Sequence, residues 1–430
     1  MMNHQIHTQR SRFFLAAAPL FLVLFIDSMG LGLVFPIMNA LVVDPNAHFV
    51  SGQISASMRN IIFGLTIAIY MFCWFFGAAI LGDLSDQMGR KRALMICLIG
   101  AVFGYLLSAL SVIFQSLTLL IVGRIIAGFT AGSQSIAQAA IVDISSSEHK
   151  ARNLGLMLFV ISMGFVFGPL AGGVLSDQDL SSSFNYATPF YFAAAISLIN
   201  AVLLQLFFRE TFTRTEKLRF KLSHSLEIFV SAFTHEKVRE LSIILLVMIF
   251  GWSSFYSFIP MFLLHVYHFN SLQTGIYMGV MGAGFGIGTG LLVERCTRYF
   301  SLRQCTMGGA LIAAIASALT LAAPDIHFVW FYIIPLAIAM AIAYSTILTL
   351  FSNQVDEKSQ GWVMGITGSI MAFAFGINGI LVAMLANLDI RIPLVLSAAG
   401  LTLSALLMKL LFKGSEKNTI PADASQEFLP

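Results

Sequence analysis

Long apolar stretches alternate with short polar connections along the whole chain, and this alternation limits the possible folds more than any other feature. Each of twelve stretches is about 20 residues long, the length that a helix needs to cross the hydrocarbon core of a bilayer. We expect helices at residues 13–38, 61–81, 93–114, 117–142, 155–175, 189–208, 241–264, 272–293, 307–323, 328–351, 362–386 and 392–412. Charged residues make up only 10% of the chain, so most of its surface must face lipid. The sequence predicts an all-α polytopic membrane protein with twelve transmembrane helices.

The basic residues indicate how these helices are oriented. The chain has 24 Lys and Arg residues, and all but Arg59, Arg124 and Arg391 fall near the two ends of the chain or in the loops that follow every second helix. Basic loops stay on the cytoplasmic side of a membrane. We therefore expect a multi-pass protein of the inner membrane with both termini in the cytoplasm. The basic residues are scattered among loops, which argues against nucleic acid as a partner.

A short charged segment recurs in the two halves of the chain. Residues 82–92 form a polar, glycine-bounded turn between two apolar stretches, and residues 290–298 are a weaker copy. The corresponding pairs are Gly82 with Gly290, Leu84 with Leu292, Asp86 with Glu294, and Arg90 with Arg298. The repeat predicts two six-helix bundles of the same orientation, over residues 1–208 and 241–414, with a cytoplasmic linker at 209–240 and a tail at 415–430. A substrate path would lie between the bundles.

Further motifs of fixed spacing follow the same order as the expected helices. Residues 82–92 match G-x-L-x-D-x-x-G-R-K-R, and residues 124–128 match R-x-x-x-G. Residues 155–173 carry glycines and a proline at fixed positions: Gly155, Gly164, Gly168, Pro169, Gly172 and Gly173. Asp27 and Pro36 form D-x8-P, with Asn39 in place of a second proline, and residues 209–211 read Arg-Glu-Thr. In these motifs the chain resembles the major facilitator superfamily, and specifically its drug:proton antiporter branch of tetracycline-exporter-like multidrug efflux transporters.

The resemblance implies a proton-coupled exporter, of the kind that confers antibiotic resistance, that works by alternating access between two bundles. Three departures qualify it. Gln87 stands where a basic residue is usual, and Asp83 adds a second acid. Residues 307–323 contain no acid, although tetracycline exporters are expected to carry one there. This last departure argues against tetracycline as the substrate and leaves proton coupling mostly to the first half.

Two charged residues fall inside expected spans, and we predict that both act in proton coupling. A charge within the hydrocarbon core is costly unless it is paired, solvated or neutralised, so such residues are usually functional. Asp27 is the candidate proton and substrate site, and we expect Arg124 to lie close enough to sense its charge, directly or through water. The structural alternatives are a buried hydrogen bond for Asp27 and backbone carbonyl partners for Arg124.

The charged segments are predicted to control gating. We expect Asp86 to meet Arg90 and the start of the helix at 362–386, where it would lock the cytoplasmic side shut. Gly82 and Gly89 would permit the turn, and Glu294 with Arg298 would act in the second half. The alternative is an ordinary solvated turn.

The glycines of the fifth expected helix are predicted to form a hinge and seal. Gly164, Gly168 and Gly172 recur every four residues on one face and permit close helix approach, while Pro169 permits a bend. Tight packing alone is the alternative. Candidate substrate-binding residues are the amides and aromatics of other spans, which suit an amphipathic organic solute, or alternatively belong to an interfacial belt: Gln134, Gln138, Trp252, Tyr256, Tyr332 and Tyr344.

The function that we predict is export of small organic compounds by proton antiport. No ATP-binding loop, catalytic triad or metal-ligand cluster is present in the sequence, so we expect no enzyme, no metal and no cofactor, with the proton gradient as the energy source. The expected partners are a small-molecule substrate, protons and the lipid bilayer, and we expect a monomer. Two alternatives stay open: a transporter of a specific metabolite or siderophore, and a non-transporting membrane receptor or assembly partner.

Overall fold

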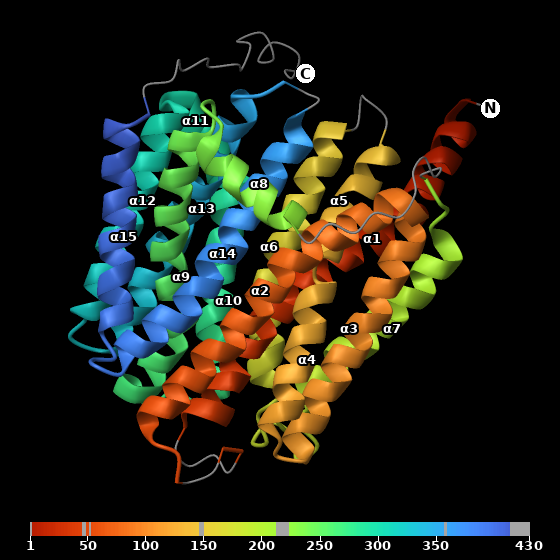
Figure 1. Cartoon of the computed structure of the whole chain (residues 1–430). Helices are drawn as coiled ribbons and strands as arrows, with labels where there is room; N and C mark the ends of the chain where they lie inside the picture. Colours follow the sequence, from red (N-terminus) through yellow and green to blue (C-terminus); the bar gives the residue numbers. More distant parts are fainter. Residues whose placement is uncertain are drawn as a thin grey trace.

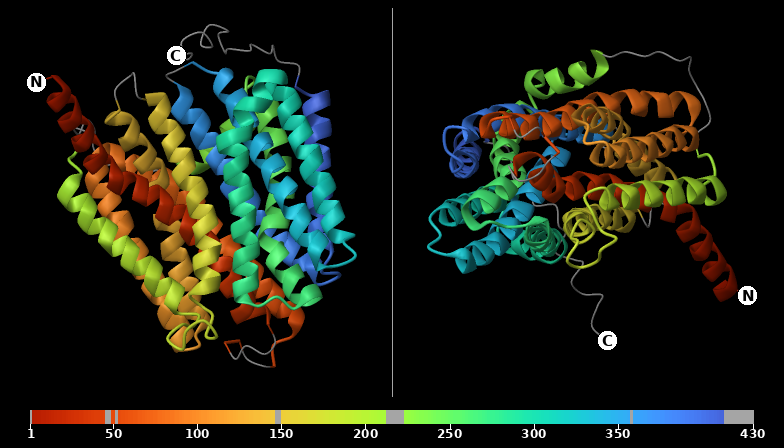
Figure 2. Two further views of the ribbon diagram at one scale, coloured as in Figure 1. Left: turned by 180° about the vertical axis from the view of Figure 1, so that it is seen from behind. Right: turned by 90° about the horizontal axis from the view of Figure 1, so that it is seen from below.

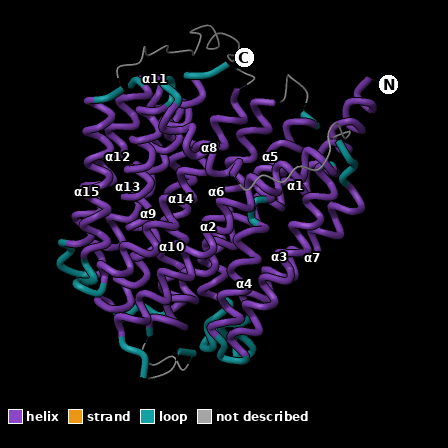
Figure 3. Tube along the Cα trace, in the orientation of Figure 1, coloured by secondary structure: helices purple, strands orange, loops and turns teal. Residues whose placement is uncertain are grey.

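The computed structural model describes residues 2–44, 49–50, 53–145, 150–211, 223–356 and 359–412, and these residues are helical with short connections and no strand (Figure 3). The first half contains α1 (Met2–Met38), a π-helical turn η1 (Asn39–Val43), α2 (Ala56–Met88), α3 (Arg90–Ile113), α4 (Leu117–Thr130), α5 (Ser133–Asp143), α6 (Lys150–Val174) and α7 (Thr188–Phe207). The second contains α9 (Arg239–Tyr267), α10 (Ser271–Ile287), a π-helical turn η2 (Gly288–Leu292), α11 (Val293–Tyr299), α12 (Leu302–Leu321), α13 (Ile326–Asn353), α14 (Gln360–Ala386) and α15 (Ile392–Leu410). Helix α8 (Ser223–Thr234) lies between the halves in sequence.

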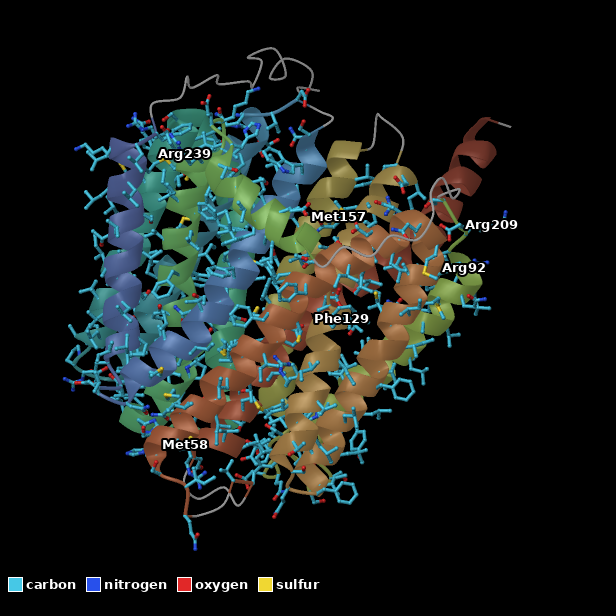
Figure 4. The ribbon with its side chains drawn as sticks, viewed as in Figure 1. Met58, Arg92, Phe129, Met157, Arg209 and Arg239 are labelled. Atoms are coloured by element: carbon cyan, nitrogen blue, oxygen red, sulfur yellow. The ribbon has the colours of Figure 1, made fainter. Side chains whose placement is uncertain are left out.

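Twelve segments in the described residues are long and apolar enough to cross a membrane, which confirms the twelve spans predicted from hydropathy. Helix α1 begins and α15 ends at the same end of the molecule, which we call the proximal end, and the opposite end is the distal end (Figure 1). Arg239, at the start of α9, lies at the proximal end, whereas Met58 of α2 lies at the distal end (Figure 4). The predicted tail at 415–430 lies outside the described residues.

The two halves meet along two seams, α2 against α14 and α6 against α10. Glycines bring the backbones of both seams together: a Cβ atom added at Gly64 would collide with the carbonyl oxygen of Gly379, and one added at Gly173 would lie 2.7 Å from the Ser271 carbonyl oxygen. Small residues at such crossings let membrane helices approach closely. Both pairs lie toward the distal end, so the halves are closely packed there.

Two side-chain hydrogen bonds reinforce the distal contact between the halves. The Asn39 side-chain amide donates to the Pro260 carbonyl oxygen at 2.9 Å, and the Asn60 amide donates to the Asn387 side-chain oxygen at 2.9 Å. Nearby, the buried Arg59 guanidinium donates to three carbonyl oxygens of the α1–α2 connection, those of Val42, Asp44 and Val50. Arg59 therefore fixes the connection from which Asn39 reaches the second half.

The fourth predicted helix, at 117–142, is not continuous. It is divided into α4 and α5 at Ala131 and Gly132, because this point crosses α2 backbone to backbone. A Cβ atom at Gly132 would lie 2.5 Å from the Gly77 carbonyl carbon, and one at Gly77 would collide with the Phe129 carbonyl oxygen. Ser133 begins α5 directly after the break.

The charged segments are also more helical than predicted. Residues 82–88 continue α2 to Met88, so Gly89 alone makes the turn before α3. Likewise 290–298 is not a hairpin, because η2 and α11 carry the helix on to Tyr299. The linker predicted at 209–240 contains α8, and its residues 212–222 lie outside the described part of the chain.

Candidate functional site

Asp27 lies in the middle of α1 and is held by the broken fourth span. The Ser133 hydroxyl donates a hydrogen bond of 2.5 Å to Asp27 Oδ2. An intramolecular hydrogen bond contributes about 0.5–1.5 kcal/mol. Asp27 keeps part of its surface exposed, whereas Ser133 is buried. The break between α4 and α5 therefore presents a hydroxyl to the one acidic side chain found in the middle of a predicted span.

Arg124 of α4 is buried and stacks on an aromatic ring. Its guanidinium carbon lies 4.0 Å from the centroid of the Tyr70 ring, a cation–π contact typically worth about 0.5–2 kcal/mol. Its Nε atom is buried and has no hydrogen-bond partner. Tyr70 is thus a partner of Arg124 that neither the coupling role nor the structural alternative named.

Asp27 and Arg124 form no ion pair in the structure. Tyr70 of α2 and Tyr105 of α3 instead lie within electrostatic range of both residues. The Tyr105 hydroxyl also occupies the space in which a Cβ atom of Gly30 would stand, one turn from Asp27. The two buried tyrosines therefore connect the surroundings of the acid with those of the base, which sequence reasoning did not predict.

The glycine stripe of α6 packs against α1 on both sides of Asp27. A Cβ atom at Gly164 would lie 2.6 Å from Ser28 Cβ, and one at Gly168 would lie 2.5 Å from the Met29 carbonyl oxygen. Gly172 continues this contact to Leu33, and Pro169 fits against Gly32 of α1. The predicted close helix approach is confirmed, and its partner is the helix that carries Asp27. The role of the stripe as hinge or seal stays a prediction.

An aromatic cluster joins the two halves on the distal side of Asp27. The Tyr256 ring of α9 has its centroid 5.1 Å from that of Phe35 on α1 and 6.3 Å from that of Phe165 on α6. Trp252 and Phe375 lie 5.7 Å and 6.2 Å from the same ring. The Tyr256 hydroxyl is buried without a hydrogen-bond partner. An aromatic ring with a free hydroxyl is the kind of group that orients an organic solute.

The other candidate substrate residues lie in different surroundings. Tyr344 joins the cluster through Phe285, whose ring lies 6.4 Å from both Tyr344 and Trp252. The ring neighbours of Tyr332 are the exposed Phe328 and Phe331 of its own helix, as an interfacial aromatic belt requires. Gln134 and Gln138 are partly buried on α5, the helix that carries Ser133.

A charge network surrounds Arg90 at the proximal end of α3. Its guanidinium donates to Asp86 at 2.6 Å and to Ser85 at 2.9 Å, both on α2, and to Asp143 of α5 at 3.3 Å. The predicted pairing of Asp86 with Arg90 is confirmed, whereas its contact with the start of α14 stays a prediction. In the second half Glu294 and Arg298 pair at 2.5 Å on α11, and both are well exposed.

Glu210 has a role that its motif alone did not reveal. Its carboxylate accepts hydrogen bonds from the backbone N–H groups of Arg90 at 2.8 Å and Lys91 at 3.1 Å, so it caps the N-terminus of α3. The same carboxylate fills the space beside Gly89, whose φ of +99° suits glycine. Arg92 and Arg209 both lie near this end of α3 and α7 (Figure 4). The Arg-Glu-Thr triplet marks Glu210 in the sequence, but the backbone N–H group of Arg90 that it binds lies 120 residues away along the chain.

Elsewhere, the described residues contain no group of three His, Cys, Asp or Glu side chains that could hold a metal ion. A hollow of about 550 Å³ lies at the proximal end, between α8 and the start of α14. Neither Asp27 nor any residue of the aromatic cluster lines it. We therefore place the candidate site at Asp27 and the aromatic cluster.

Comparison with known proteins bears on all of these features. A family model described as Major Facilitator Superfamily matches residues 20–378. Tetracycline resistance protein, class C, of Escherichia coli is 28% identical over 346 residues, which are 79% of this chain and 82% of that protein. Quinolone resistance protein NorA of Staphylococcus aureus (strain COL) is 23% identical over 92% of this chain and 95% of its own. The crystal structure of a D-xylose-proton symporter has a similar fold, with a TM-score of 0.74 at 16% identity over 94% of this chain and 98% of that one.

Proposed function

Because the chain belongs to the Major Facilitator Superfamily, we propose that it exports small amphipathic organic compounds across the inner membrane in exchange for protons. Membership makes it a membrane-embedded transporter of small molecules and not an enzyme. The observation that carries the proposal is Asp27, the acidic residue in the middle of a span, with its Ser133 hydrogen bond and its partly exposed surface. Relatives named for tetracycline and quinolone resistance support efflux as the direction.

Proton and substrate take turns at Asp27 in the proposed cycle. A carboxylate within the membrane is stable when it binds either a proton or a polar or cationic group of the substrate, and unstable alone. Substrate that arrives from the cytoplasm displaces the proton, and a proton from outside displaces the substrate. The proton gradient supplies the energy, so no further cofactor is required.

Alternating access requires that one side of the site closes while the other opens. The distribution of the basic residues supports a proximal end in the cytoplasm, together with both termini. The distal hydrogen bonds and glycine seams would then close the outer side. The Arg90 network and the Glu294–Arg298 pair lie at the proximal end, where they would control closure.

The aromatic cluster supports a substrate that has an aromatic or otherwise flat, apolar part. Tyr256 carries the partnerless hydroxyl, and the rings of Trp252 and Phe375 lie on the second half while Phe35 and Phe165 lie on the first. Opening of the outer side would separate these two groups of rings. A bound compound would thus contact both halves, as coupling of binding to movement demands.

Purified protein in proteoliposomes with an imposed pH gradient tests the proposal. The compounds to compare are lipophilic cations, aromatic antibiotics, siderophores and polar metabolites, with proton movement recorded by an internal pH-sensitive dye. We expect amphipathic aromatic compounds to drive proton efflux from vesicles loaded at low pH, and transport to occur with the monomer. Proton movement with siderophores or polar metabolites alone would favour the metabolite-transporter alternative. No transport of any compound, with specific binding retained, would favour a receptor.

A further inference from the structure

Helix α8 lies beside the membrane-spanning helices and not beneath them. In Figure 1 it crosses α14 and α2 obliquely, and the view from below in Figure 2 places it on the rim of the bundle, outside these two helices. The contacts of α8 agree, because it packs on α2, α14 and α9. A linker segment that connects two bundles in water has no need of such a position.

The inner face of α8 touches both halves of the protein. The Phe229 ring has its centroid 4.5 Å from that of Phe373 on α14 and 5.9 Å from that of Phe75 on α2. The Trp362 indole N–H donates to the Ser231 hydroxyl at 3.2 Å, which fastens α8 to the start of α14. Phe229 is therefore a bridge across the α2–α14 seam on its proximal side.

The partners of Phe229 lie deep along their helices. Phe373 follows Gln360, the first residue of α14, by 13 positions, which corresponds to about 20 Å at ~1.5 Å per residue. Phe75 precedes Asp83, a charged residue of α2, by 8 positions, or about 12 Å. The hydrocarbon core of a bilayer is about 30 Å thick. Phe229 thus contacts α2 and α14 within their membrane-spanning segments.

The outer face of α8 combines the exposed Leu226 and Val230 with the exposed Glu227 and Thr234, so it is amphipathic. Leu226 and Val230, one helical turn apart, keep 50% and 54% of their surface exposed, whereas Ser225 and Ala232 on the inner side are buried. Ser225–Thr234 is apolar as a whole. An amphipathic helix that lies along a membrane buries such apolar side chains at the boundary between headgroups and acyl chains and keeps its polar side chains toward the headgroups.

We propose that acyl chains of the adjacent leaflet bind the Leu226–Val230 face, and that α8 is a membrane-inserted strap which holds α2 and α14 through Phe229. The proposal requires only that the protein is embedded in a membrane, so it does not depend on proton antiport. Because Phe229 contacts both helices, a change in the proximal distance between α2 and α14 must break or compress one of its two ring contacts. Lipid solvation of the outer face keeps the strap in place.

Spin-label accessibility tests the lipid contact. The parent protein carries Ser in place of the partly exposed Cys73 and Cys296 and keeps the buried Cys97 and Cys305. Labelling of this parent, without any added cysteine, gives the background signal. Labels at Leu226→Cys and Val230→Cys are compared in phosphatidylethanolamine–phosphatidylglycerol vesicles for relaxation by oxygen and by a water-soluble nickel chelate. Leu406→Cys, on exposed α15 surface, is the lipid control, and Glu236→Cys, exposed after α8, is the aqueous control.

We expect both α8 positions to match Leu406, with oxygen severalfold more effective than the nickel chelate. Accessibility like that of Glu236 would overturn the proposal. Protection from both reagents, or dipolar broadening between labels on two copies, would show a protein neighbour in place of lipid and would equally overturn it.

The bridging role of Phe229 has its own measurement. Labels at Gly82→Cys and Gly361→Cys report the proximal distance between α2 and α14, since a Cβ atom at either glycine meets nothing within 4 Å. We expect Phe229→Ala to broaden or shift this distance distribution, and the matched Val230→Ala to leave it unchanged. Identical distributions in all three proteins would contradict a strap.

Discussion

The hydroxyl of Ser133 donates to the carboxylate of Asp27 across the interface between α5 and α1, at 2.5 Å. This contact depends on the break at Ala131 and Gly132, which starts α5 at Ser133. Close backbone contact of the break with Gly77 of α2 positions it. The helix that carries the acid is thereby linked to two others of the same bundle.

Replacing Ser133 by Ala should impair transport more than any neighbouring polar substitution. An intramolecular hydrogen bond contributes about 0.5–1.5 kcal/mol, so we expect Ser133→Ala to slow proton-driven transport about two- to tenfold. Ser135→Ala is the matched control, because Ser135 is exposed and donates only to the Gly132 carbonyl oxygen. Initial rates in proteoliposomes at equal protein density measure the effect. Equal losses in the two variants would indicate that the Asp27 contact is irrelevant.

Substitution of two glycines in the same charged segment should give opposite results. Gly89 has φ +99° and contacts Glu210, so Gly89→Ala should cost about 1–3 kcal/mol and lower the melting temperature by several degrees. Gly82 is helical with open space around it, so Gly82→Ala should leave stability unchanged or raise it by up to about 1 kcal/mol. Thermal unfolding of detergent-solubilised protein gives both values. A less stable Gly82 variant would refute this assignment of the turn to Gly89.

A large side chain in the distal seam should prevent its closure. A Cβ atom at Gly379 would lie 2.8 Å from the Gly64 carbonyl oxygen, so Gly379→Leu must separate α14 from α2. Gly368→Leu, on the same helix in open space, is the control. Spin labels at the exposed Met58 and Leu388 measure the distal distance. We expect a longer distance in Gly379→Leu only, and an unchanged distance there would show that the seam tolerates bulk.

The start of α14 should loosen at low pH. The hydrogen bond that the Ser359 side chain donates to Asp356 lowers the pKa of that carboxyl below its ordinary value. Because the folded state holds the proton less tightly than the unfolded state, this interaction stabilises the loop above the unfolded pKa and is lost as the pH falls through the folded pKa. Amide hydrogen exchange at Gln360 and Trp362, corrected for its intrinsic pH dependence, should accelerate over that range. In Asp356→Ala it should be fast already at neutral pH, and persistent pH dependence there would point to another group.

Hydropathy and spacing predicted much of the fold because each membrane helix must satisfy its own backbone and expose apolar side chains. The twelve spans follow from this requirement, and the pairing of Asp86 with Arg90 follows from opposite charges that stand four residues apart on the two sides of a turn. The close approach of α6 to a neighbour followed from glycines every four residues.

Contacts between distant segments were not predictable in the same way. Gly132 and Ser133 stand at the break in the sequence, but they do not reveal it, because its position is set by the backbone of Gly77 on another helix. The charged residues 82–88 are predicted as part of a turn, but they form the last two turns of α2. A helix that emerges from the membrane tolerates charged residues, and Gly89 alone ends it. The capping of α3 by Glu210 and the stacking of Arg124 on Tyr70 likewise join residues from different helices.

Proton release on substrate binding is the most direct measure of competition at Asp27. Detergent-solubilised protein in weak buffer is mixed with a transported compound, and a pH indicator reports released protons, with wild type and Asp27→Asn compared at equal occupancy. The account predicts release by the wild type, and binding without release by Asp27→Asn. Equal release by the two proteins would contradict it, because the exchanged proton would then belong to another group.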